Sequence, residues 1–153
     1  MTNKQEVFSC GHYSCCVLGG ETDSPTFQKL SGISEITRIE CGYFHSICID
    51  VNNDMYVFGF NRHGQLGLGD TIKRFSPTKH PSFSNIIDVS SSGYCTFVKT
   101  SSNEIYAFGR NDYSQLGIET EDEIQLTPIR IFEDNEDIWH SNIKRLRAKS
   151  ARK

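Results

Sequence analysis

The 153-residue sequence contains no apolar run that approaches the roughly 20 residues needed by a membrane-spanning helix. Its first six residues, Met-Thr-Asn-Lys-Gln-Glu, are polar and lack the apolar stretch of a signal peptide. The sequence therefore predicts no membrane span and a cytoplasmic or nuclear location. The length is sufficient for one domain with a sizeable core.

The cysteines lack the regular spacing of a disulfide framework or a zinc finger; they stand at positions 10, 15, 16, 41, 48 and 95. Without an export signal, we expect them to be reduced, small and buried. Cys10-Gly-His12-Tyr-Ser-Cys15-Cys16 contains residue types that bind zinc, but this segment aligns with a repeat turn. We therefore expect no metal site and no cofactor.

Charge is distributed unevenly along the chain. The last ten residues carry +6 without an acid, and the body before them carries −9, which together give the net charge of −3. An acidic body does not suit a whole-domain nucleic-acid binder. Contact with nucleic acid or a nucleosome is thus left to the basic tail, whose cations are Lys144, Arg145, Arg147, Lys149, Arg152 and Lys153. The alternative is a solvated tail, or one folded against the acidic stretch at 119–137.

A segment near the middle of the chain occurs twice. Residues 55–69 and 105–117 share seven identical positions at an offset of 50, occupied by Tyr, Phe, Gly, Asn, Gln, Leu and Gly. A degenerate third copy lies 48 residues before the first, at Cys10-Gly11 and Leu18-Gly19. A period near 50 is typical of one supersecondary unit used several times, as in a propeller or solenoid. Such chains usually present a surface rather than a catalytic pocket.

The units consist of short aromatic and β-branched runs separated by polar clusters, which predict strands joined by tight turns. Ile47, Ile49 and Val51 are expected on one strand face, as are the pairs Tyr56 with Phe58 and Tyr106 with Phe108. Asn52-Asn53-Asp54 suits a hairpin turn. Leu66 and Leu116 are expected to anchor their loops in the core. The predicted organisation is a degenerate partial repeat at 1–35, repeats at 36–85 and 86–134, and a basic helix or tail at 135–153.

The tail has a helical pattern. Asn135 suits a helix N-cap, and Trp139, Ile143 and Leu146 follow one another at i, i+4 and i+7 on one apolar stripe. The pattern predicts a helix over about 135–149.

The residues Cys41-Gly42-Tyr-Phe-His45-Ser46, followed by Tyr56-Val-Phe58-Gly59 and by Asn61-Arg-His-Gly64-Gln65-Leu66-Gly67-Leu-Gly69-Asp70, form one motif. It resembles the regulator of chromosome condensation repeat over roughly residues 7–132. The resemblance implies blades of four antiparallel strands, usually seven in a ring. It also implies roles such as nucleotide exchange on a nuclear small GTPase, docking on nucleosomes, and scaffolding in ubiquitin ligases. The second unit departs from the motif, with Ser91-Ser92 and Cys95 in place of Cys41-Gly42 and His45.

The predicted fold class is all-β, an incomplete β-propeller of about two and a half to three blades followed by a C-terminal α-helix. An open array leaves strand edges and a blade face uncovered. We consider four candidates for what covers these surfaces: the helix with Trp139, a second copy of the chain, a partner protein, or a missing remainder of a longer product.

Two motifs resemble catalytic or phosphate sites. His45 and Ser46 are adjacent, but catalysis would need a third orienting group, so we expect His45 to hydrogen-bond a neighbouring blade. No Lys-Ser/Thr follows the glycines at 64–69, which disfavours a phosphate-binding loop. The loop residues that flank the repeat asparagines are the partner-binding candidates, with a solvated turn as the alternative for each: Phe60, Arg62, His63, Arg110, Asp112 and Tyr113.

The predicted function is a non-enzymatic protein-interaction module, a scaffold or an adaptor. The alternative is a guanine-nucleotide exchange or regulatory factor for a small GTPase, associated with chromatin. A hydrolase or metal enzyme has no convergent site in the sequence. The expected partner is a protein, with a small GTPase as one candidate, and self-association through exposed blade edges is a further expectation.

Overall fold

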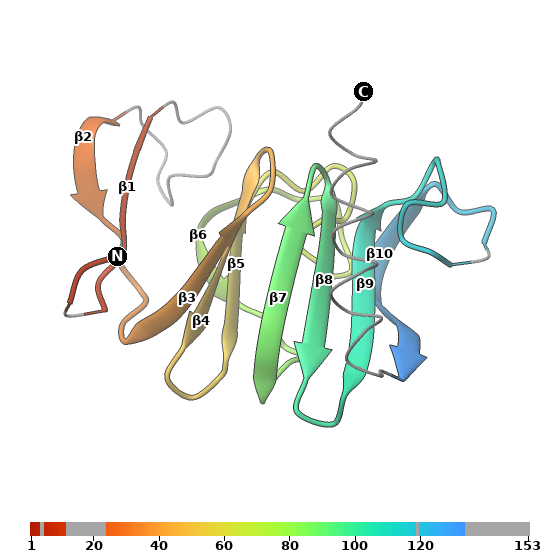
Figure 1. Cartoon of the computed structure of the whole chain (residues 1–153). Coiled ribbons are helices and arrows are strands. Elements are labelled where there is room, and N and C mark those ends of the chain that lie inside the picture. The colour runs from red at the N-terminus through yellow and green to blue at the C-terminus, as the bar shows by residue number, and fades with distance from the viewer. Residues whose placement is uncertain (4, 12–23, 119, 134–153) are drawn as a thin grey trace.

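A computed structural model describes residues 1–3, 5–11, 24–118 and 120–133. Every regular element in these ranges is a β-strand, as the sequence predicts (Figure 1). The expected C-terminal helix at 135–149 and the cations of the basic tail lie outside the described residues. The strands are β1 (Phe8–Gly11), β2 (Ser24–Lys29), β3 (Ile36–Cys41), β4 (His45–Asp50), β5 (Met55–Gly59), β6 (Arg74–Lys79), β7 (Ile86–Ser92), β8 (Cys95–Thr100), β9 (Glu104–Arg110) and β10 (Ile124–Glu133).

The strands form three antiparallel sheets. β1 and β2 make a two-stranded sheet, and two four-stranded sheets follow in the orders β3-β4-β5-β6 and β7-β8-β9-β10. The two larger sheets stand side by side, as consecutive blades of a propeller do (Figure 1). We call them blade 1 and blade 2. The tight turn between β4 and β5 uses Asn53 at φ 62°, and the turn between β8 and β9 uses Asn103 at φ 60°, which confirms the predicted hairpin at 52–54.

The main core lies between the two blades. On blade 1 it includes Ile47, Met55, Val57 and Leu66, and on the side of blade 2 it includes Phe83, Ile86, Val89, Val98 and Phe108. We call this cluster the interblade core. A second cluster joins Val7 and Leu30, which flank the β1–β2 sheet, to Ile36, Cys48 and Phe58 of blade 1. Strand β4 is therefore buried on both faces, rather than on the one face that alternation predicts.

Several residues correct the sequence-based expectations. Val51 does not share a strand face with Ile47 and Ile49, because β4 ends at Asp50 and Val51 begins the turn with 43% of its surface exposed. Cys48 and Cys95 are buried as expected, but Cys10 and Cys41 are exposed, since Cys10 is the next-to-last residue of β1 and Cys41 ends β3, and both are edge strands. The cysteines in the described ranges are free thiols.

The repeat asparagines and leucines hold the loops that follow β5 and β9. Leu66 and Leu116 are completely buried, which confirms their predicted anchoring role. The Leu66 amide donates to Asn61 Oδ1 at 2.9 Å, and Asn61 Nδ2 donates to the Asp70 carbonyl at 2.9 Å. Asn111 accepts from the Leu116 amide at 3.2 Å in the same way. These buried bonds make both loops rigid, so that their exposed side chains are presented in fixed positions.

A buried polar chain joins the blades. His45 Nε2 lies 3.0 Å from Thr96 Oγ1, and the Thr96 hydroxyl donates to the Gln65 carbonyl at 2.8 Å. Because that hydroxyl uses its proton on Gln65, its oxygen accepts from His45 Nε2–H. The bond confirms that His45 binds the neighbouring blade. Its complete burial also keeps the imidazole away from any substrate.

Candidate protein-interaction surface

Four loops gather at one end of the two blades. In an antiparallel meander, the turn between the first two strands and the loop after the third strand lie at the same end. This places residues 42–44 beside 60–64 in blade 1, and residues 93–94 beside 110–114 in blade 2. The Tyr43 amide donates to the Gly93 carbonyl at 3.0 Å, which joins the two sets of loops.

The Phe-Gly pair of each repeat brings these loops into contact. Gly59 and Gly109 have φ values of 112° and 114°, which disfavour any residue with a Cβ. A Cβ on Gly109 would lie 2.2 Å from the Tyr94 carbonyl oxygen, and one on Gly59 would lie 2.5 Å from the Phe44 carbonyl oxygen. Because neither glycine carries a Cβ, both carbonyls can accept a hydrogen bond. The Tyr94 carbonyl accepts from the Arg110 amide at 3.0 Å, and the Phe44 carbonyl accepts from the Phe60 amide at 2.7 Å.

An aromatic cluster forms on this framework, with Tyr94 at its centre. The Tyr94 ring centroid lies 4.6 Å from that of His63, 5.8 Å from Tyr43 and 5.9 Å from Phe44. Phe60 completes the cluster at 6.3 Å from Tyr94 and 6.2 Å from Phe44. These distances and the tilted or edge-on ring angles are the ones that aromatic pairs prefer.

Arg110 extends the cluster to Tyr113. Its guanidinium carbon lies 6.0 Å from the Tyr94 ring centroid and 5.6 Å from that of Tyr113, within cation–π range. Asp112 forms an ion pair with Arg110 and accepts from Gln115 Nε2 at 3.0 Å. Partial burial raises the pKa of Asp112, but the hydrogen bonds from Gln115 and Arg110 outweigh it and hold that pKa below its ordinary value. The carboxylate is thus charged at neutral pH and fixes the guanidinium.

His63 is neutral at pH 7. Partial burial lowers its pKa, and the charge of Arg110 lowers it further. Arg62 is exposed beside it and forms no ion pair with the described residues. We call the whole surface the aromatic face; its members are Tyr43, Phe44, Phe60, Arg62, His63, Tyr94, Arg110, Asp112 and Tyr113.

The structure thus brings the loop candidates Phe60, His63, Arg110, Asp112 and Tyr113 onto one surface, with Arg62 next to them. Sequence reasoning missed Tyr43, Phe44 and Tyr94. The strand order could have identified them, because they lie in the turns between the first two strands of each blade, at the same end as the predicted loops.

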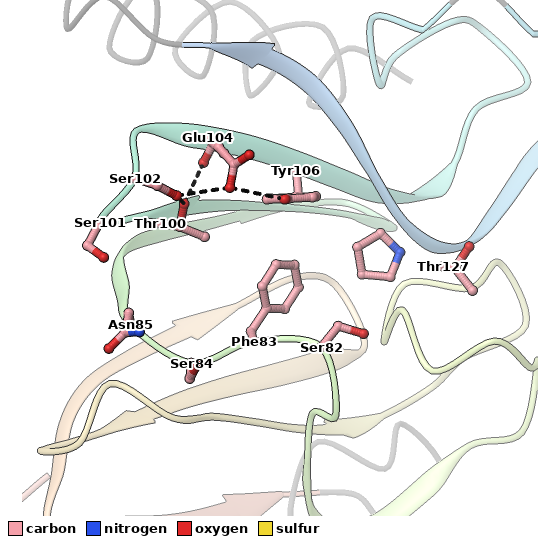
Figure 2. A pocket seen from close by; sticks show the side chains of 11 residues that line it. Ser82, Phe83, Ser84, Asn85, Thr100, Ser101, Ser102, Glu104, Tyr106 and Thr127 are labelled. Carbon is pink, nitrogen blue, oxygen red and sulfur yellow. Dashed lines mark hydrogen bonds between the residues drawn. The ribbon is translucent and has the colours of Figure 1, made fainter.

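A polar cleft lies at the opposite strand ends (Figure 2). It encloses about 540 Å³ between the segment after β6, the β8–β9 turn and β10. Glu104 organises one wall, where it accepts from Ser102 Oγ at 2.9 Å and from the Tyr106 hydroxyl at 3.2 Å, and it pairs with Arg130 at 3.0 Å. The lining residues are Ser82, Phe83, Ser84, Asn85, Thr100, Ser101, Ser102, Glu104, Tyr106, Thr127 and Pro128. Among the described lining residues there is no histidine, lysine or cysteine, and the carboxylate of Glu104 is already engaged by Ser102, Tyr106 and Arg130.

Metal and membrane features can be assessed for the described part of the chain. There, no three side chains of histidine, cysteine, aspartate or glutamate converge on a common point. Residues 12–16 of the zinc-like segment lie outside the described ranges. The described residues also form no helix of a length and apolarity that would cross a bilayer.

The fold and the aromatic face define a class, the β-propeller repeat proteins whose strand-end loops form a continuous surface. A family model described as regulator of chromosome condensation (RCC1) repeat matches residues 52–98 and 102–141, and a second model of this repeat matches residues 36–65. The chain belongs to the family of RCC1-repeat proteins.

Three similar proteins illustrate the family. The probable E3 ubiquitin-protein ligase HERC4 of Homo sapiens is 37% identical over 99 residues, which cover 63% of this chain and 9% of HERC4. The crystal structure of human WBSCR16 matches with a TM-score of 0.76 and 24% identity, over 86% of this chain and 36% of that one. Prp20p of Saccharomyces cerevisiae, described together with its binding to Gsp1p and histones, has a TM-score of 0.71 and 17% identity, over 86% and 35%. This chain therefore spans about a tenth of HERC4 and about a third of each solved structure, and the two structural likenesses show the fold.

Proposed function

We propose that this chain is a non-enzymatic protein-interaction module that binds a protein partner through the aromatic face. One observation supports this above all: Tyr43 and Tyr113 keep 51% and 61% of their surface exposed on a rigid, two-blade framework. Tyrosine and arginine dominate the binding energy of protein interfaces, because they combine large contact area with polar groups. Rings already held in position lose little conformational entropy when a partner binds.

The non-enzymatic part of the proposal is supported by the two places where chemistry was most plausible. His45 lies beside Ser46, but both side chains are buried and the imidazole bonds Thr96. In the polar cleft, Glu104 is already bonded to Ser102, Tyr106 and Arg130. Neither place presents a free base next to an accessible nucleophile.

Nucleotide exchange on a small GTPase is the second candidate, because Prp20p is described as binding Gsp1p. An exchange factor must displace a bound nucleotide and magnesium over a broad face. The two blades correspond to about a third of Prp20p. We therefore expect no acceleration when release of a fluorescent guanine nucleotide from a Gsp1-type GTPase is followed with and without the full chain. A clear acceleration would replace the adaptor proposal with the exchange proposal.

The adaptor proposal is tested by site-specific photo-crosslinking. A benzoylphenylalanine replaces Tyr113 on the aromatic face or, as the matched control, Val51, which is 43% exposed at the opposite strand ends. After irradiation in cytosolic and nuclear extracts, we expect a discrete protein adduct from position 113 and none from position 51. The same adducts from both positions would show that capture does not depend on the face.

A further inference from the structure

The polar cleft lies at the strand ends opposite the aromatic face, so it is a separate place in the fold (Figure 2). The segment after β6, the β8–β9 turn and β10 form its walls. The Ser101 amide donates to the Asn85 carbonyl at 3.0 Å, which joins the first two walls at one end. Thr127 lies at the other end (Figure 2). The enclosed volume of about 540 Å³ is within the range of small-molecule sites.

The wall formed by the β8–β9 turn is already hydrogen-bonded within itself. The hydroxyls of Thr100 and Ser102 lie 2.9 Å apart, and Glu104 accepts from Ser102. Arg130 Nη1, 3.0 Å from Glu104 Oε1, offsets the charge of this carboxylate. Among the described lining residues, Glu104 alone is acidic or basic. The cleft therefore offers no unpaired charge to attract an ionic ligand.

The remaining polar groups of the lining include four exposed side chains without a hydrogen-bond partner among the described residues. They belong to Ser82, Ser84, Asn85 and Ser101. Hydroxyl and amide side chains both donate and accept hydrogen bonds, so they are complementary to a ligand whose groups do the same. Tyr106 and Pro128 are half-buried and add apolar surface beside these groups. The lining suits a neutral ligand that combines hydroxyl groups with C–H surface.

The first repeat shows that the fold does not require these polar residues. Asn85 corresponds to Glu35 at an offset of 50, and the two have φ values of 64° and 53°. Ser101 corresponds in the same way to Val51, whose amide donates to the Glu35 carbonyl at 3.0 Å. The backbone is thus the same in the two units, but the second has neutral polar side chains where the first has a carboxylate and an apolar group.

We propose that this cleft binds a neutral polyhydroxylated small molecule, a sugar or a cyclic polyol. Ser84, Asn85 and Ser101 hydrogen-bond its hydroxyl groups, and Tyr106 with Pro128 contacts its C–H surface. An anionic ligand is disfavoured, because the carboxylate of Glu104 lies in the wall. The proposal does not rest on the adaptor function, since the aromatic face lies at the opposite strand ends.

Titration of the ¹⁵N-labelled full-length chain, followed by NMR, tests the proposal. The hydroxylated probes are maltose, N-acetylglucosamine, mannose and myo-inositol, and triglycine serves as a peptide probe. We expect at least one hydroxylated probe to shift the backbone amides of Asn85 and Ser101 in a saturable manner at concentrations up to about 20 mM. The amide of Tyr94, on the aromatic face, should not shift.

The first repeat also supplies the variants. Asn85→Glu and Ser101→Val each introduce the residue that the first repeat carries at the same backbone position, so the fold should be retained. Each should weaken binding by about threefold or more, because a hydrogen bond to the ligand is lost. Ser84→Ala should also weaken binding. Ser34→Ala changes the equivalent serine of the first repeat and should leave the affinity unchanged.

Three results would overturn the proposal. One is that no hydroxylated probe shifts the amides of Asn85 and Ser101. Another is that a folded protein carrying both Asn85→Glu and Ser101→Val binds the probe as tightly as the wild type. The third is a response to triglycine alone, which would identify the cleft as a peptide-binding site.

Discussion

Gly67→Ala is expected to destabilise the protein by roughly 2–5 kcal/mol, a large share of the 5–15 kcal/mol typical of a domain. Gly67 has a φ of 68°, where an L-residue with a Cβ costs about 1–2 kcal/mol. The new Cβ would also lie 2.8 Å from two carbons of the Phe108 ring and 3.0 Å from His80 Nε2. Both rings are buried at the interblade core, and overpacking of this kind costs a further 1–3 kcal/mol or so.

The repeat provides a matched control for this substitution. Gly117 stands 50 positions later with a φ of 74°, and no atom lies within 4 Å of the place its Cβ would take. Gly117→Ala should therefore lower the unfolding free energy only by the cost of a Cβ at positive φ, about 1–2 kcal/mol. Urea unfolding of the two variants and the wild type measures the difference. Equal losses of unfolding free energy in the two variants would contradict the predicted clash between a Cβ at Gly67 and the rings of Phe108 and His80.

Acid should destabilise the protein through two buried histidines, by roughly 4 kcal/mol between pH 6.5 and 4.5. Burial lowers the pKa of His45 to about 4 and that of His80 also to about 4. The Ser82 amide donates to His80 Nδ1 at 3.2 Å, which favours the neutral ring. The Gly67 carbonyl, 3.1 Å from Nε2, raises the pKa of His80 but only partly offsets the effect of burial. The unfolded chain takes up protons below about pH 6.5, but the folded chain does so only near pH 4. Stability is therefore full above pH 6.5 and falls as the pH approaches 4.

His80→Gln isolates one of the two histidines. It should lower the slope of unfolding free energy against pH in this window by up to half, because His45 and, to a smaller extent, His63 still contribute to it. The carboxylates with lowered pKa values, Asp70 and Asp112, begin to take up protons in the unfolded chain only near the acid end of this window, so they add little to the slope above about pH 5. Urea midpoints measured from pH 7.5 to 4.5 give the slope. A flat profile would show that the imidazoles are not buried in the neutral form.

The sequence predicts the repeat architecture well, because identical residues at a fixed offset have to occupy identical environments. As expected, Leu66 and Leu116 are buried and Asn53 has a left-handed backbone conformation. Tyr56 and Phe58 also lie on the same strand face, as predicted. The two-sided burial of β4 follows from its position between two other layers, which alternation within one strand does not reveal. The prediction that Val51 shares a strand face with Ile47 and Ile49 was wrong, because the local pattern does not locate the end of the strand at Asp50.

The aromatic face was predictable only in part. The loops at 60–63 and 110–113 follow equivalent strands, so aligning the two repeats of the sequence with each other was enough to infer that these loops are exposed. Tyr94 sits in a turn where the second unit departs from the first, and its central place depends on the stacking of blade 2 against blade 1. Which side chains meet across two blades is a property of that packing.

The most direct test of the account is the affinity of the captured partner for two variants of the full chain. Tyr94→Ala removes the ring at the centre of the aromatic face, and Val51→Ala removes an exposed side chain at the opposite end. Calorimetric titration should show a loss of about tenfold or more for Tyr94→Ala and no change for Val51→Ala, because central aromatic residues dominate interface energies. Unchanged affinity in a folded Tyr94→Ala protein would contradict the assignment of this face as the docking surface.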